Sequence, residues 1–313
     1  MTGTEVGDPG SEAPDGAGEP DQPAASGEDG APVRGRNRTA RFAWGAVVVI
    51  LVAVIALVTY ALTTPKQRVV QRAVAAPGVV AQLAKVPTSV FDAVGISAPD
   101  TTLAAPTVLS GQPPLREAGK PEVLYVGAEF CPFCAAERWP LIVALSRFGH
   151  FVGLKNMQSA PLSVFPGIQT FSFVGSTYSS RYLTFAGVEL YSDAVDAQGA
   201  FTRIATLSPV QTLAVARYGK RPGNSASPGT FPFVDIGNRM VTSTSGFSPA
   251  VLVRQSQEGI AGSLDQAADP VTQAVVAAAN QLTAGACAVT GQRPAPVCSS
   301  KGVREAAASL GLP

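Results

Sequence analysis

The stretch EVLYVGAEFCPFCAAERWPLIVALSRFG, residues 122–149, decides the fold. It begins with an uninterrupted apolar run, Val123–Val126, which is typical of a central strand buried on both faces of a sheet. Helical spacing follows, because Leu141, Leu145 and Phe148 fall on one face of a helix. The sequence therefore predicts a strand, a short turn and a helix, with the motif CPFC at the turn.

The motif Cys131-Pro132-Phe133-Cys134 occupies the N-terminus of the expected helix. Unpaired backbone N–H groups and the helix dipole stabilise an anion there, so we expect the pKa of the Cys131 thiol to lie below its usual ~8.5. Cys134 lies one turn inside the helix, where it is shielded and can attack a mixed disulfide on Cys131. The motif thus predicts two catalytic cysteines that exchange thiols and disulfides.

Three other interpretations of the motif stay open. The two thiols could be inert core residues, or they could form a structural disulfide, which would constrain very little chain. They could also be half of a metal site completed by Cys287 and Cys298, but the spacing of eleven between those two does not match a second C-x-x-C. We therefore expect no metal.

The segment GAEFCPFC, residues 127–134, resembles the active-site signature of thioredoxin-fold thiol–disulfide oxidoreductases, and TFPF at 230–233 is a second match. The resemblance implies an α/β fold whose thioredoxin-like central sheet is flanked by helices. It also implies a cis-proline at Pro232 beside the cysteines and a backbone at Phe231 that pairs with a bound chain. On this resemblance four residues bind substrate: Pro132, Phe133, Phe231 and Pro232.

More narrowly, residues from about 85 to 300 resemble a membrane-anchored thioredoxin-like family that is classed only as a domain of unknown function. That family supplies no substrate. Two positions depart from the wider thioredoxin pattern: Tyr125 stands where thioredoxin has a buried Asp, and Phe133 where the strongest oxidants have His. We therefore expect a moderately lowered pKa at Cys131 and an intermediate reduction potential.

Charged residues flank the motif. Glu129 and Glu137 are candidates for proton transfer to or from Cys134, with surface solvation as the alternative for each. Arg138 is expected on an exposed helix face, where it could guide an acidic partner.

Cys287 and Cys298 follow the last long helix pattern. In an oxidising compartment they would form a structural disulfide, which closes a short loop and contributes about 3 kcal/mol in the loop-entropy description. A second redox pair that passes electrons to Cys131 and Cys134 stays open, as do two free thiols.

Residues 43–62, AWGAVVVILVAVIALVTYAL, carry no charge and are long enough to span a bilayer as a helix. We expect an uncleaved signal-anchor here rather than a cleaved signal peptide or a buried soluble helix. Four arginines precede the segment and three basic residues follow it, which favours a cytoplasmic N-terminus. The sequence thus predicts a single-pass protein of the cell membrane with an extracytoplasmic C-terminal domain.

Composition and punctuation divide the rest of the chain. The expected order is a disordered cytoplasmic tail at 1–41, a transmembrane anchor at 42–63, a stalk and domain-lead segment at 64–118, a thioredoxin-like domain with a C-terminal helical extension at 119–300, and a C-terminal tail at 301–313. Within the domain we expect a helix at about 199–218, a hairpin turn at Gly237-Asn238, and a helix that begins at Asp269-Pro270.

A formal net charge of +1, with charged residues at 14%, gives no basic field for nucleic acid. The predicted function is a membrane-anchored extracytoplasmic thiol–disulfide oxidoreductase without a cofactor. Its expected partners are protein thiols or disulfides, an unidentified redox recycling partner, and the membrane through residues 43–62. The alternatives are a non-enzymatic binding module for a membrane or envelope partner, and a metal chaperone that uses the dithiol.

Overall fold

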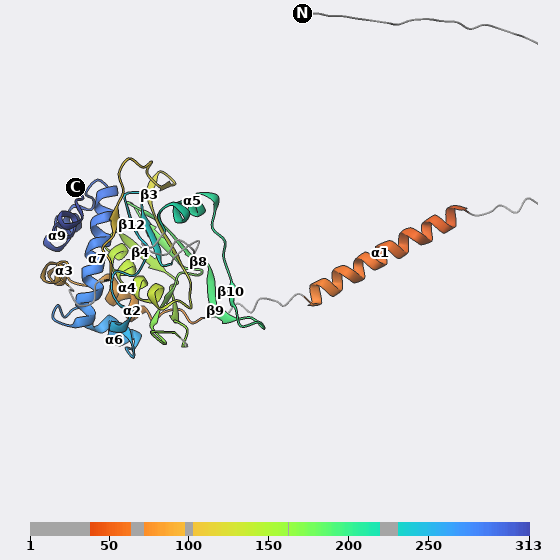
Figure 1. Ribbon diagram of the computed structural model, residues 1–313, viewed down its shortest axis with the longest axis horizontal. Coiled ribbons are helices and arrows are strands. Elements are labelled where there is room, and N and C mark those ends of the chain that lie inside the picture. The colour runs from red at the N-terminus through yellow and green to blue at the C-terminus, as the bar shows by residue number, and fades with distance from the viewer. Residues whose placement is uncertain (1–37, 64–71, 98–102, 162, 220–230) are drawn as a thin grey trace, which may run out of the picture. The chain divides into compact units, whose positions relative to one another are not determined.

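The computed structural model describes residues 38–63, 72–97, 103–161, 163–219 and 231–313. The chain divides into two compact units, residues 1–68 and 69–313. Helix α1 (Arg38–Thr63) belongs to the first unit, and the remaining elements belong to the second (Figure 1). Residues 1–37 of the tail that was predicted as disordered lie outside the described residues, and residues 38–41 belong to α1.

The prediction of a transmembrane helix at 43–62 is wrong. Across the described part of the chain, no helix combines the length and the apolar character that crossing a membrane requires. The fold class is therefore corrected to a mixed α/β structure of a sheet and helices.

Strand β3 (Lys120–Gly127) lies at the centre of the main sheet. It pairs antiparallel with β11 (Phe233–Ile236) and parallel with β8 (Thr184–Glu189). The sheet continues from β11 to β12 (Met240–Thr242) and β1 (Thr107–Val108), while β2 (Arg116–Glu117) pairs with the start of β3. The apolar run predicted as a strand is thus hydrogen-bonded on both sides.

The side chains of β3 alternate between two cores, as the period of two residues in a strand requires. Val123 and Tyr125 belong to the large core under α4 (Pro132–Ser146) and α7 (Pro270–Val289). Leu124 and Val126 face a smaller core, which α5 (Pro209–Tyr218) covers. Figure 1 shows α7 and α5 on opposite sides of the sheet. The structure confirms the prediction that this strand is buried on both faces.

Short helices surround the large core. They are α2 (Pro77–Ala84), α3 (Thr88–Val94), the 3₁₀ turn Pro249–Leu252, α6 (Gln257–Ser263), α8 (Ala295–Cys298) and α9 (Lys301–Leu310). Leu83 and Phe91 are buried in that core, so the described part of the predicted stalk is integral to the domain. The segment expected as a C-terminal tail instead forms α9, whose residues Val303 and Ala306 are buried in the same core. Apolar spacing alone did not reveal which surface these helices cover.

Among the described residues, three two-stranded ribbons accompany the main sheet: β4 (Gly149–Val152) with β7 (Thr177–Ser180), β5 (Lys155–Gln158) with β6 (Gln169–Ser172), and β9 (Tyr191–Val195) with β10 (Phe201–Arg203). The helix predicted at 199–218 begins only at Pro209, where Ser208 forms a capping box with Gln211. The preceding residues form β10 because they find a partner strand in β9.

Two local predictions are confirmed. Gly237 and Asn238 both have positive φ, 62° and 55°, and the N–H of Arg239 donates to the carbonyl of Ile236 at 2.9 Å, so the expected tight turn joins β11 to β12. The loop is one residue longer than the expected two, because Ile236 pairs with Met240. The side chain of Asp269 caps α7 by accepting hydrogen bonds from the N–H groups of Val271 and Thr272 at 2.8 and 3.2 Å.

Candidate functional site

Cys131 and Cys134 lie at the start of α4, directly after β3. Cys131 is the N-cap residue, and its Sγ accepts a hydrogen bond from the backbone N–H of Cys134 at 3.3 Å. Both are free cysteines; Cys131 is 6% exposed and Cys134 is 0% exposed. A sulfur atom of a substrate can therefore contact Cys131, whereas Cys134 is buried beneath the surface.

The two thiols have opposite acidities. A hydrogen bond with the Cys134 side chain lowers the pKa of the Cys131 thiol; burial opposes this, and backbone N–H groups and Arg138 add to the lowering. Burial raises the pKa of the Cys134 thiol well above its usual value, and the neighbouring Cys131 raises it further. Cys131 is thus the better nucleophile, and Cys134 keeps its proton until Cys131 has reacted.

The residues predicted to bind substrate lie around the thiols. Phe133 and Phe231 pack against the small cluster that Ala128 forms with the two cysteines. Pro132 is the first residue of α4. The Phe231–Pro232 peptide bond is cis, and Pro232 is buried immediately before β11. Two segments separated by about one hundred residues in the chain thus meet at the motif.

Sequence reasoning missed an aromatic cluster beside the motif. The ring of Phe130 stacks on Phe201, with 3.8 Å between centroids, and contacts Phe231 and Tyr191 edge-on at 5.9 and 6.3 Å. All four rings are only partly buried. Phe201 lies on β10, in the segment whose pattern was interpreted as a helix. The dense aromatic content between 165 and 201 was the available signal.

Glu129 is neither solvated nor free to serve as a simple surface base. Its carboxylate receives two hydrogen bonds from Arg72, at 3.3 and 3.0 Å, and its side chain is 5% exposed. Arg72 also pairs with Asp193 on β9. This ion pair fastens the segment before α2 to the turn that precedes Cys131.

Glu137 is also buried, at 1% exposure. Its carboxylate accepts a hydrogen bond from the N–H of Gly246 at 2.9 Å. Burial raises the pKa of Glu137 to about 8, although the Gly246 hydrogen bond opposes the rise. The surface interpretation is excluded for this residue, and near neutral pH it can hold a proton inside the domain.

Arg138 was expected on an exposed helix face, but its side chain is 0% exposed. It forms a two-point ion pair with Glu189 of β8, with Nε–Oε1 at 2.9 Å and Nη2–Oε2 at 2.7 Å. Arg138 comes four residues after Cys134, and Glu189 comes from a distant strand. This ion pair could not be predicted from the sequence, because its two residues come together only when β8 pairs with β3.

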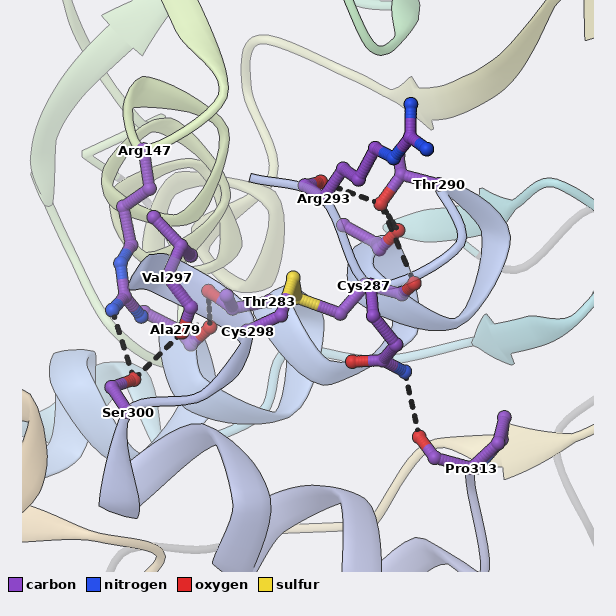
Figure 2. Close-up of a disulfide and its surroundings, with 12 residues drawn as sticks. Arg147, Ala279, Thr283, Cys287, Thr290, Arg293, Val297, Cys298, Ser300 and Pro313 are labelled. Atoms are coloured by element: carbon purple, nitrogen blue, oxygen red, sulfur yellow. Dashed lines mark hydrogen bonds between the residues drawn. A yellow bond between two sulfur atoms is a disulfide. The ribbon is translucent and has the colours of Figure 1, made fainter. Parts of the chain in front are cut away.

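Cys287 and Cys298 form a disulfide that joins the end of α7 to α8 (Figure 2). Beside it, Thr290 Oγ1 donates to the carbonyl of Arg293 at 2.7 Å. Because these sulfurs bond to each other, they cannot complete a four-sulfur metal site with the CPFC motif. In the described ranges of the chain, no group of three or more His, Cys, Asp and Glu residues could hold a metal ion.

Residues 108–288 match the family described as Domain of unknown function (DUF929), over more than half of the chain. The chain belongs to this family. The DUF929 region covers the CPFC motif, Phe231 and Pro232, and it ends before Cys298. No curated protein matches the chain, and no solved structure matches it either. The family therefore identifies the domain without assigning it an activity.

Proposed function

We propose that this DUF929 protein is a thioredoxin-like thiol–disulfide oxidoreductase that exchanges disulfides with protein substrates through Cys131 and Cys134. The observation that carries the proposal is the asymmetry of the pair. A reachable thiol of lowered pKa caps a helix, and a fully buried thiol of raised pKa lies one turn behind it.

The proposed exchange has two steps. In the first, the Cys131 thiolate attacks a substrate disulfide; one S–S bond breaks, a mixed disulfide forms, and the released substrate thiolate takes up a proton. In the second, Cys134 loses its proton and attacks Sγ of Cys131, which releases the other substrate sulfur as a thiolate. The substrate gains two electrons, and the Cys131–Cys134 pair becomes the disulfide. The reverse sequence oxidises a substrate dithiol.

The surroundings of the pair support a polypeptide substrate. Phe133 and Phe231 line the cysteines with apolar surface, and Phe231 lies two residues before the first residue of β11. An extended chain could therefore lie along Phe231 and Pro232 while its sulfur meets Cys131. A dithiol or disulfide redox protein would recycle the pair.

The proposal includes an oxidising, extracytoplasmic location for the domain. The Cys287–Cys298 disulfide supports this, because structural disulfides persist in oxidising compartments and are rare in the reducing cytosol.

The test is to trap the mixed disulfide. In Cys134→Ser the second step cannot occur, so the variant should accumulate covalent partners that a reductant releases. The matched control is the double variant Cys131→Ser/Cys134→Ser, which should trap none. If Cys134→Ser gives no reducible adduct with either its native partners or a model disulfide peptide, the exchange activity is refuted and a non-enzymatic binding module is favoured.

A further inference from the structure

A buried positive charge lies behind the two cysteines. The guanidinium of Arg138 is fully buried with Glu189 on β8, and the pair is held by two hydrogen bonds. Its Nη1 group is buried without a hydrogen-bond partner among the described residues. Removing two charges from water costs several kcal/mol per ion, so an apolar pair of similar volume would often serve stability equally well. The position of this ion pair therefore calls for another explanation.

The guanidinium is tied directly to the turn that carries Cys131. Nη2 of Arg138 donates to the carbonyl oxygen of Ala128 at 2.9 Å. The same carbonyl accepts the backbone N–H of Cys131 at 3.2 Å. Ala128 also packs with both cysteines in one small cluster. A single oxygen atom thus links the buried cation to the backbone of the reactive cysteine.

The charged groups around the pair come from β3, β8, α4 and the turn between β3 and α4, where Glu129 acts electrostatically on Glu189. Tyr125 of β3 lies with its ring centre 5.7 Å from the guanidinium carbon, and its hydroxyl is buried without a partner in the described chain. Glu189 comes from β8, and Cys134 comes from the same helix as Arg138. Arg138 favours the thiolate form of both cysteines, whereas Glu189 opposes it at Cys134. Arginine keeps its charge at any physiological pH, so its contribution is permanent.

We propose that Arg138 is a positioning residue of this site: it holds the turn before Cys131 in place and keeps a fixed positive charge behind the Cys131–Cys134 pair, which favours the reduced form. A disulfide carries no charge, whereas the reduced pair can carry a thiolate, so a nearby cation stabilises only the reduced form. The pair is then a stronger oxidant of substrate thiols than its CPFC sequence alone would make it. This inference rests on the proposed redox function of the pair.

The experiment measures the thiolate absorbance of Cys131 against pH in the Cys134→Ser background, where one thiol titrates alone. Arg138→Gln should raise the pKa of Cys131 by about one unit. At any pH below that pKa, the thiolate fraction should then be about tenfold smaller than with Arg138 in place. Glu189→Gln should shift it the opposite way, because the positive charge then stands uncompensated. Arg138→Lys keeps the charge and should recover part of the shift.

A purely structural role predicts a different pattern. Arg138→Gln and Glu189→Gln would then both loosen the site and move the pKa of Cys131 in the same direction, or not at all, and either result overturns the inference. If Arg138→Gln does not fold, the apolar pair Arg138→Met/Glu189→Leu replaces it, since such exchanges often preserve stability. That double variant removes two opposing charges, so it should raise the pKa of Cys131 by less than one unit, and a lowered pKa would contradict the proposal.

A second measurement separates this inference from the proposed function. Equilibration of the intact Cys131–Cys134 pair with glutathione should show about tenfold more disulfide in Arg138→Gln than in the wild type. If trapping through Cys134→Ser succeeds but this equilibrium does not move, the exchange function stands and the role of Arg138 is refuted. If the equilibrium moves but nothing is trapped, the electrostatic role stands without the activity.

Discussion

Cys131 occupies the N-cap position where Ser, Thr, Asp or Asn usually stands, and its sulfur accepts the N–H of Cys134. The helix start therefore supplies part of the stabilisation of a thiolate, and the Cys134 thiol supplies the largest single share. Neither contribution needs a buried acid at position 125 or a histidine at position 133. The two departures noted in the sequence, Tyr125 and Phe133, thus leave a workable nucleophile.

Removing the thiol at position 134 should raise the pKa of Cys131. Cys134→Ala deletes the side-chain hydrogen bond that lowers this pKa, so we expect the value to move toward the usual ~8.5. The pH dependence of the rate of Cys131 alkylation measures it. Cys134→Ser is the matched control, because its hydroxyl can still donate and should keep most of the lowering. Equal pH profiles for the two variants would argue against this hydrogen bond.

Glu137 should make stability fall as the pH rises. In the folded protein its carboxyl keeps a proton up to about pH 8, whereas in the unfolded chain it loses the proton near the ordinary 4.5. The folded state binds the extra proton between these values, so the cost of burying Glu137 grows through that window to about 3 kcal/mol at pH 7.

The neutral variant Glu137→Gln should remove this cost. Its free energy of unfolding relative to the wild type should improve steadily from pH 4.5 to 8, measured by urea denaturation at several pH values. Glu258→Gln, at an exposed position, should stay within about 0.5 kcal/mol of the wild type throughout. A flat difference for Glu137→Gln would mean that this carboxyl does not titrate in the window.

The β9–β10 ribbon reaches the site through Phe201, which stacks on Phe130, and through Tyr191, which contacts the same ring edge-on. Phe130 immediately precedes Cys131, so the ribbon helps to hold the approach to the nucleophile. Phe201 reaches this position from a strand and not from the predicted helix, because the backbone of β10 pairs with β9. The pairing of β10 with β9 therefore also brings Phe201 to the ring beside Cys131.

Phe201→Ala should lower the free energy of unfolding by about 1–2 kcal/mol and speed the alkylation of Cys131 at fixed pH. The loss of a stacked, partly buried ring causes the first effect, and a more open approach causes the second. Val195→Ala tests the ribbon itself, since Val195 lies on β9 at 58% exposure and should change either value little. Equal effects of the two variants would locate the role in the ribbon rather than in the ring.

In the 69–313 unit, the C-terminal elements close the large core from outside. The Cys287–Cys298 disulfide joins α7 to α8, and α9 then packs on α7 through Val303 and Ala306. Arg147 adds a contact across this region, because it donates to Ser300 at 3.2 Å (Figure 2). Its guanidinium also lies over the ring of Phe91. The disulfide thus ties Cys287, at the end of the family match, to Cys298 beyond it.

Cys287→Ser/Cys298→Ser should lower the free energy of unfolding by about 3 kcal/mol, the value expected for closing a short loop. It should leave the pKa of Cys131 unchanged, because the C-terminal end of α7 packs on Gly237 beside the start of β3, whereas the CPFC turn follows the end of β3. Denaturation and alkylation assays on the same variant check both statements. A shifted pKa would instead favour the interpretation of these cysteines as a second redox pair.

Local chemistry was enough to predict β3, the helix that starts at the CPFC motif, the Gly237-Asn238 turn and the Asp269 cap. Each depends on residues within a few positions of one another, so the pattern contains its own partners. The apolar run at 43–62 shows the limit of such reasoning, since no helix in the described part of the chain is long and apolar enough to cross a membrane.

Contacts between side chains distant in the sequence were decided only by the tertiary structure, because no local pattern specifies them. The fold buried Arg138 against Glu189, tied Glu129 to Arg72, and brought Phe201 to the ring before Cys131. These partners lie tens of residues apart in the chain, and the preference of each for water or for burial changes once the other is beside it. A charged or aromatic side chain carries no sequence signal of the partner it will meet, because that partner is chosen by the docking of whole strands and helices.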